Sequence, residues 1–178
     1  ALNELKIARD GRGRPVLRGS AIAGVLRSNF RRAKQMKLQQ SGVDPSAASE
    51  QVDAQIAYFF GRAQEQDATD VASRLLVADA VLERSHNPHN STTQRTHHLR
   101  NRHTGAVVDG GLFSLEATAP ETRATLVLWL KDDADEDESK GQAFLQELVN
   151  LLNGACFFGG HRARGLGRAV LADDPLYC

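Results

Sequence analysis

Glycine and arginine residues are concentrated near the end of the sequence, in the segment GGHRARGLGRAV at residues 159–170. Glycine lets a backbone approach a ligand closely, and the planar guanidinium of arginine suits phosphate. The segment precedes a strand-like stretch rather than a helix, and no lysine follows at a phosphate-loop spacing, which argues against a dinucleotide-binding fold. These residue types predict contacts with a polyanion. A simple turn into the last strand is the alternative interpretation.

Positive charge is also concentrated in the first part of the sequence. Ten lysines and arginines lie between Lys6 and Lys37 against the single acid Asp10, although the formal net charge of the whole chain is zero. From Arg84 to Val108 there are four arginines and five histidines and no carboxylate, whereas acids concentrate at 131–140. This segregation predicts a basic surface for a nucleic-acid backbone, and an unevenly charged, solvated surface is the alternative. Aromatic residues make up 6% of the chain, too few for a surface that stacks many bases.

Five histidines lie in the polar stretch 83–111, at His86, His89, His97, His98 and His103. No acid or cysteine lies among them between His86 and His103, and a loop-like stretch offers no rigid frame for a metal ion, so we expect no metal site. The favoured interpretation is an arm that contacts nucleic acid through these histidines and Arg95, Arg100 and Arg102. The spacing supports no nucleophilic triad.

The composition describes a soluble globular chain of 178 residues, 41% of them hydrophobic and 25% charged. No segment has the length and apolarity of a membrane span, and we recognise no signal peptide. Cys156 and Cys178 show neither metal nor disulfide spacing. A reducing, cytoplasmic location is therefore expected.

Apolar periodicity predicts the elements that must position these residues. We expect helices at 19–38, with Ser20 as N-cap, at 50–61 and at 136–154. Strands are expected at 4–9, 73–82, 112–119, 123–130 and 167–172. This order predicts an α+β fold with a ferredoxin-like or RRM-like core, in which helices cover one face of an antiparallel sheet.

Four segments carry a more specific pattern: RDGRGRPVLRGSAIAGVLR at 9–27, ASRLLVADA at 72–80, RNRHTGAVVDGGLFSLEAT at 100–118 and GGHRARGLGRAVL at 159–171. With these motifs in this order, the sequence resembles RAMP-superfamily backbone subunits of type III CRISPR effector complexes. The resemblance implies one ferredoxin-like domain over 1–178, with a helical insertion at 41–70 and a thumb-like β-hairpin insertion at 83–111.

The resemblance also implies partners. Such subunits stack along a CRISPR guide RNA, hold a complementary target RNA opposite it, and contact other RAMP subunits and the large subunit of the complex. Together with the charge pattern, it gives the RNA-binding candidates Arg14, Gly19, Ser20, Gly24, Arg27, Arg31, Arg95, Arg100, Arg102, Gly159, Gly160, His161, Arg162, Arg164 and Gly165.

The sequence departs from the family pattern at its beginning. Members that cut target RNA use an aspartate shortly before the RD block, where this sequence has Asn3 and Glu4. Glu4 and Asp10 are therefore the candidate catalytic residues, for orienting a 2′-hydroxyl or a metal-bound water. We expect no tightly bound cofactor, and Mg²⁺ only if target RNA is cleaved. Arg18 stands where the family favours proline, and the family's first strand would lie upstream of Ala1.

Two rival functions remain open. A related RAMP endoribonuclease would process precursor CRISPR RNA with a histidine as general acid or base, for which His97, His98 and His103 are candidates. An RRM-like regulator outside CRISPR biology would bind unrelated single strands without partner subunits.

Overall fold

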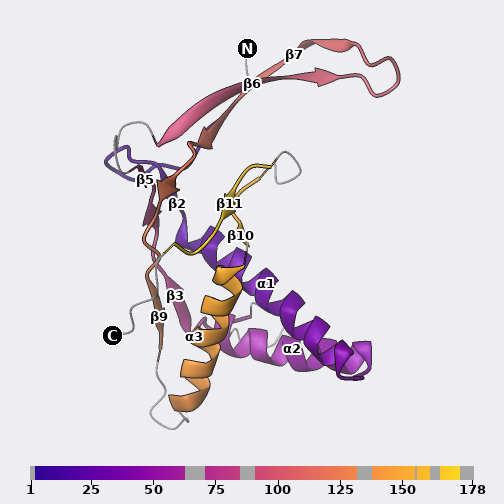
Figure 1. Ribbon diagram of the computed structural model, residues 1–178, viewed down its shortest axis with the longest axis vertical. Helices are drawn as coiled ribbons and strands as arrows, with labels where there is room; N and C mark the ends of the chain where they lie inside the picture. Colours follow the sequence, from indigo (N-terminus) through magenta and orange to yellow (C-terminus); the bar gives the residue numbers. More distant parts are fainter. Residues whose placement is uncertain are drawn as a thin grey trace. The chain divides into compact units, whose positions relative to one another are not determined.

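The computed structural model describes residues 3–62, 71–84, 91–131, 138–154, 156–160 and 165–172, and it is a mixed α/β structure (Figure 1). It divides into two compact units. Unit 1 comprises Ala1–Arg18 and Asp79–Leu126, and unit 2 comprises Gly19–Ala78 and Val127–Cys178. Each unit is described by itself below.

Unit 1 is built around the long strand β7 (Val107–Thr118). This strand pairs antiparallel with β6 (Thr92–Arg100) and parallel with the short β1 (Asn3–Leu5). Two further antiparallel pairs join β2 (Val16–Leu17) to β4 (Ala80–Val81) and β5 (Glu83–Arg84) to β8 (Thr122–Arg123). The buried apolar side chains of this unit include Val16, Ala80, Leu115 and Ala117.

The far end of the β6–β7 hairpin is closed by a polar turn. The side-chain oxygen of Asn101 accepts hydrogen bonds from the His103 and Thr104 amides at 2.8 and 3.3 Å, and Gly105 has a φ of 68°. Asparagine and glycine suit such a turn because one mimics a backbone acceptor and the other adopts positive φ without strain. All residues from Gln94 to Gly110 are exposed except the half-buried His97.

Unit 2 contains the three helices of the described residues: α1 (Gly19–Gln40), α2 (Pro45–Phe60) and α3 (Glu138–Asn153). Each buries one apolar stripe, and the stripes meet in an aromatic cluster. The Phe144 ring lies edge-on to Phe30, with centroids 5.4 Å apart, and also contacts the rings of Phe59 and Phe60. An ion pair of 2.7 Å between Lys34 and Glu147 links α1 to α3.

Two short strand pairs complete unit 2. β3 (Leu75–Val77) pairs antiparallel with β9 (Leu128–Leu130), and β10 (Cys156–Phe157) pairs antiparallel with β11 (Arg168–Ala169). Leu76 lies opposite Trp129 in the first pair. Both side chains face outward, and that of Trp129 is 53% exposed.

The helix starts follow from local chemistry. Asp44 caps α2, where its carboxylate accepts hydrogen bonds from the Ser46 and Ala47 amides and Pro45 occupies the first turn. This cap explains why α2 begins at 45, ahead of the expected 50. The expectation for Ser20 is wrong, because α1 already begins at Gly19 and Ser20 lies inside its first turn.

The three expected helices are confirmed, but the strands differ from the expectations. The single strand expected at 73–82 is two short strands, β3 and β4, in different units. β6 and β10 were not expected as strands from apolar alternation.

Across the described ranges the strands form one three-stranded sheet with a parallel pair and four two-stranded antiparallel sheets. The continuous ferredoxin-like sheet and both insertions therefore stay predictions. None of the helices described has the length and apolarity needed to cross a membrane.

Candidate nucleic-acid interface

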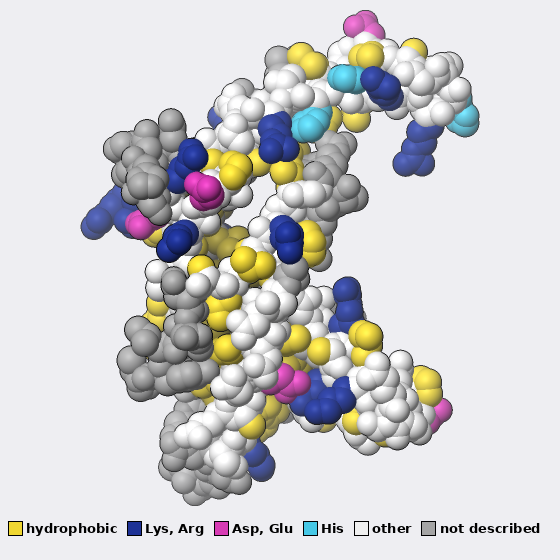
Figure 2. Space-filling view, in the orientation of Figure 1, with side chains coloured by type: hydrophobic (Ala, Val, Ile, Leu, Met, Phe, Trp, Pro, Cys, Tyr) yellow, Lys and Arg dark blue, Asp and Glu magenta, His cyan; other side chains and the backbone are white. Residues whose placement is uncertain are grey.

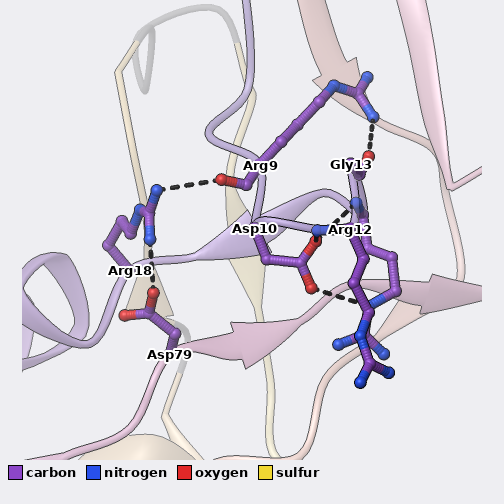
Figure 3. Close-up of polar contacts among 7 residues, drawn as sticks. Arg9, Asp10, Arg12, Gly13, Arg18 and Asp79 are labelled. Carbon is purple, nitrogen blue, oxygen red and sulfur yellow. Dashed lines mark hydrogen bonds and ion pairs between the residues drawn. The ribbon is translucent and has the colours of Figure 1, made fainter.

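A tight turn at residues 8–16 of unit 1 is organised by the Asp10 carboxylate (Figure 3). One oxygen accepts hydrogen bonds from the Arg12 and Arg14 amides at 2.9 and 2.8 Å, and the other accepts from the Arg14 Nε at 2.8 Å. Desolvation acts to raise the pKa of Asp10, but the hydrogen bonds and charge of Arg14, with the Arg12 amide, hold it below its ordinary value. Asp10 therefore lies ionised within a network of donors.

Two more arginines fix this turn to the strands around it. The Arg9 guanidinium forms an ion pair with Glu116 on β7 and donates to the Gly13 carbonyl at 3.0 Å. Arg18 forms an ion pair of 2.7 Å with Asp79 and donates to the Arg9 carbonyl at 3.0 Å (Figure 3). The sequence pattern did not indicate Glu116 or Asp79, because each lies far along the chain from its arginine.

The β6–β7 hairpin presents basic side chains to solvent. Figure 2 shows arginine and histidine side chains along it, at the top of the view. Arg95, Arg100 and Arg102 are exposed, and their contacts with nucleic acid stay a prediction.

The candidate histidines of this hairpin have different surroundings. His97 stacks on Phe113, with ring centroids 5.4 Å apart, and its Nε2 is buried with no hydrogen-bond partner in the described part of the chain. The His98 Nε2 accepts a hydrogen bond of 3.2 Å from the Arg100 Nε, while His103 lies in the exposed turn. His86 and His89 lie outside the described residues.

The N-terminal half of α1 combines two glycines with different surroundings. Gly19 is buried, and a Cβ there would lie 2.1 Å from the Val77 carbonyl oxygen, so packing within unit 2 requires a glycine. Gly24 is exposed in mid-helix, and a Cβ there would meet nothing within 4 Å. Ser20 is also exposed, whereas Arg27 is half-buried. Arg31 forms an ion pair of 2.6 Å with Asp53 on α2.

The glycines of the glycine-rich segment lie between β10 and β11. Gly167, with a φ of 77°, is held by packing, since a Cβ there would lie 2.0 Å from the Phe158 carbonyl oxygen. Gly159, Gly160 and Gly165 have nothing within 4 Å of a Cβ position, and Gly159 and Gly165 adopt positive φ. The predicted contacts at His161, Arg162 and Arg164 lie outside the described residues.

The candidate catalytic residues stay predictions. Glu4 lies on β1 opposite Ser114, and its side chain is outside what the structure describes. The Asp10 oxygens already accept three hydrogen bonds. No group of three or more histidine, cysteine or acidic side chains that could hold a metal ion occurs in the described ranges.

The predicted RNA-binding residues are thus distributed over both units. Arg14, Arg95, Arg100 and Arg102 belong to unit 1. The described candidates of α1 and of the glycine-rich segment belong to unit 2. Within unit 1 the structure brings Arg100 to His98 and Arg14 to Asp10.

Comparisons with known proteins identify the family of this chain. No curated protein matches the sequence. A chain of the solved structure "Cryo-EM structure of the Type III-B Cmr-beta bound to cognate target RNA" is similar in fold, with a TM-score of 0.60 and 14% identity over 91% of this chain and 85% of that one. A chain of the "Type IV-B CRISPR Complex" has a TM-score of 0.57 and 19% identity, over 99% of this chain and 86% of that one. Residues 1–170 match the family model of the RAMP superfamily, and the chain belongs to that superfamily.

Proposed function

We propose that this chain is a guide-RNA-binding backbone subunit of a type III CRISPR effector complex that acts in antiviral defence. Its partners would be the CRISPR RNA, a complementary target RNA, other RAMP subunits and the large subunit. The proposal includes a ferredoxin-like core, a thumb-like role for the β6–β7 hairpin and a cytoplasmic location. It draws support from the family match and from the two fold neighbours, both of them chains of CRISPR complexes.

The observation that carries the proposal is the exposed basic hairpin. It presents Arg95, Arg100 and Arg102 to solvent, and no carboxylate occurs in the sequence from Ser91 to Val108. Apolar burial does not account for a projecting hairpin whose residues 98–110 are all exposed. Such a surface suits a phosphate backbone, which arginines bind with little dependence on base sequence.

The open glycines are consistent with the same ligand. Gly24, Gly159, Gly160 and Gly165 have room for a side chain that they lack. An RNA backbone could occupy this room, because glycine at a ligand-binding position lets the ligand approach the peptide backbone closely. Sequence specificity would then come from pairing between guide and target, with the protein holding the backbone.

The first test is co-purification of the chain with its natural RNA and partner subunits at low salt. Bound RNA of defined length, released as salt is raised, is the expected result. Absence of RNA at low salt would contradict the proposal. Stable binding of unrelated single strands without partner subunits would instead support a regulator outside CRISPR biology.

A second test separates holding from cutting. The assembled complex is incubated with labelled complementary RNA and magnesium, in the wild type and in Glu4→Ala and Asp10→Ala variants. Regularly spaced products that vanish in either variant would assign target cleavage to this chain, and an intact target would assign a scaffold role. Metal-independent cutting of precursor RNA, lost in His97→Ala, His98→Ala or His103→Ala, would support the processing enzyme.

A further inference from the structure

The turn and its flanks contain four arginines but offer only three nearby carboxylates as partners. Arg9 pairs with Glu116, Arg14 with Asp10, and Arg18 with Asp79. These pairs place each guanidinium against an opposite charge, and all three arginines also hold the turn through hydrogen bonds or backbone contacts. Three of the four arginines therefore serve the fold of the turn itself.

Arg12 differs from these three. It is exposed at the tip of the turn, and its side chain has no ion pair or hydrogen bond with any other described residue. Gly11 and Gly13 flank it, and neither glycine has any atom within 4 Å of a Cβ position. A ligand can therefore reach the Arg12 guanidinium and the backbone beside it without displacing a side chain.

The backbone that carries Arg12 is nevertheless fixed. The Asp10 carboxylate accepts a hydrogen bond from the Arg12 amide (Figure 3). The Gly13 amide donates to the Asp10 carbonyl at 3.0 Å. The Arg14 carbonyl accepts from the Asp10 amide at 2.9 Å, which closes the turn from the other side. An arginine on an ordered turn loses less conformational freedom when it binds than one on a loose loop.

We propose that Arg12 binds an RNA phosphate and that Asp10 is the positioning residue that holds Arg12 in place. The assignment rests on the proposed RNA binding and identifies the contact within it. The planar guanidinium offers two parallel N–H donors to a phosphate, a geometry that lysine does not reproduce. The proposal replaces Arg14 by Arg12 as the RNA contact of this turn, because the charge of Arg14 is already matched by Asp10. It also gives Asp10 a role other than catalysis.

The test measures the affinity of the full chain for a fluorescein-labelled single-stranded RNA of mixed sequence, across a series of salt concentrations. Arg12→Gln should weaken binding about tenfold at low salt, the effect of losing one charge-assisted hydrogen-bonded contact. It should also reduce the slope of log affinity against log salt by about 0.7, the share of one phosphate on a single strand. Arg12→Lys should restore only part of the affinity.

Arg14→Gln is the matched control, because it changes the net charge of the same turn by the same amount. It leaves the Asp10 acceptor for the Arg12 and Arg14 amides in place, so its effect on affinity and slope should be clearly smaller. If both variants lose the same RNA affinity, Arg12 contributes only its net charge, and the assignment is overturned. A wild-type chain that binds no RNA would instead refute the proposed function.

Variants of Asp10 test the positioning role. Asp10→Asn keeps an acceptor for the two amides and also removes the negative charge that matches Arg14, so it should bind RNA at least as tightly as the wild type. Asp10→Ala removes the same charge but loses the acceptor, so it should bind more weakly than Asp10→Asn. If Asp10 acts through Arg12, Asp10→Ala will have no further effect in the Arg12→Gln background, which a merely additive role would not produce. Loss of target cleavage in Asp10→Asn at unchanged RNA affinity would overturn the assignment and make Asp10 catalytic.

Discussion

Replacing Gly24 by alanine separates the stability of α1 from its proposed contact with RNA. Glycine in a helix interior is less favourable than alanine by about 0.8–1.0 kcal/mol. A Cβ at Gly24 meets nothing within 4 Å, so no steric cost offsets this gain. Gly24→Ala should therefore stabilise the chain by about 1 kcal/mol, which corresponds to a rise of about 2–4 °C in the melting temperature for a chain of this size.

The same methyl group should oppose RNA binding. If the guide backbone lies against the exposed face of α1 at Gly24, the new Cβ occupies the space that the ligand uses. We expect weaker binding of single-stranded RNA by a more stable protein. This combination is hard to obtain by partial unfolding, because unfolding would lower both quantities.

The assay pairs urea denaturation with fluorescence anisotropy of labelled RNA at fixed salt. Gly19→Ala is the contrasting variant: its Cβ would lie 2.1 Å from the Val77 carbonyl oxygen, so it should destabilise the chain by about 1–3 kcal/mol. Unchanged RNA affinity in a stabilised Gly24→Ala protein would refute the assignment of this face to RNA. Loss of stability in Gly24→Ala would refute the helix argument itself.

Three further predictions test the fold. The Glu116 pKa is lowered below 4.5, because hydrogen bonds led by that of the Ile7 amide outweigh desolvation, which raises it. Glu116 therefore stabilises the fold above pH 4.5 and ceases to do so as the pH falls through its lower folded pKa. Glu116→Gln should remove this part of the acid sensitivity, measured by urea unfolding at neutral pH and well below 4.5; identical pH profiles would contradict it. Gly167→Ala should disrupt the β10–β11 pair while Gly160→Ala is tolerated, since only the first Cβ meets backbone, at 2.0 Å, and circular dichroism melting compares the two. Phe144→Ala should cost about 3–5 kcal/mol in the free energy of unfolding by leaving a cavity in the aromatic cluster, and a loss below about 1 kcal/mol would show a loosely packed core.

The sequence predicted elements well where one face is continuously apolar. Ile22, Leu26 and Phe30 recur at helical spacing and are the residues that α1 buries. Periodicity did not predict β6, because Thr92–Arg100 has no apolar alternation; only the family resemblance implied a hairpin there, and β6 is ordered by its pairing with β7. A single strand was predicted at 73–82 because the run is largely apolar, whereas the boundary between the two units falls between Ala78 and Asp79.

The sequence predicted which residue types form the candidate site, but it did not predict which carboxylate pairs with each arginine. The density of arginine in 9–18 indicated an anion-binding role, but which arginines are already matched by carboxylates depends on contacts across the chain. Glu116 lies 107 residues from Arg9, and no periodicity connects them. Arg12 was therefore absent from the expected contacts, and Arg14 stood in its place.

The outward-facing Trp129 determines what the protein's own chromophores can report. It is the single tryptophan, and both tyrosines of the sequence also fall within the ranges assigned to unit 2. In unit 1 the one aromatic ring of the phenylalanine, tyrosine and tryptophan class is Phe113. Intrinsic tryptophan and tyrosine fluorescence therefore reports on unit 2. A conformational change confined to the β6–β7 hairpin would leave this fluorescence unchanged. A tryptophan introduced by Phe113→Trp in a Trp129→Phe background would move the signal to unit 1 and let the two units be followed separately.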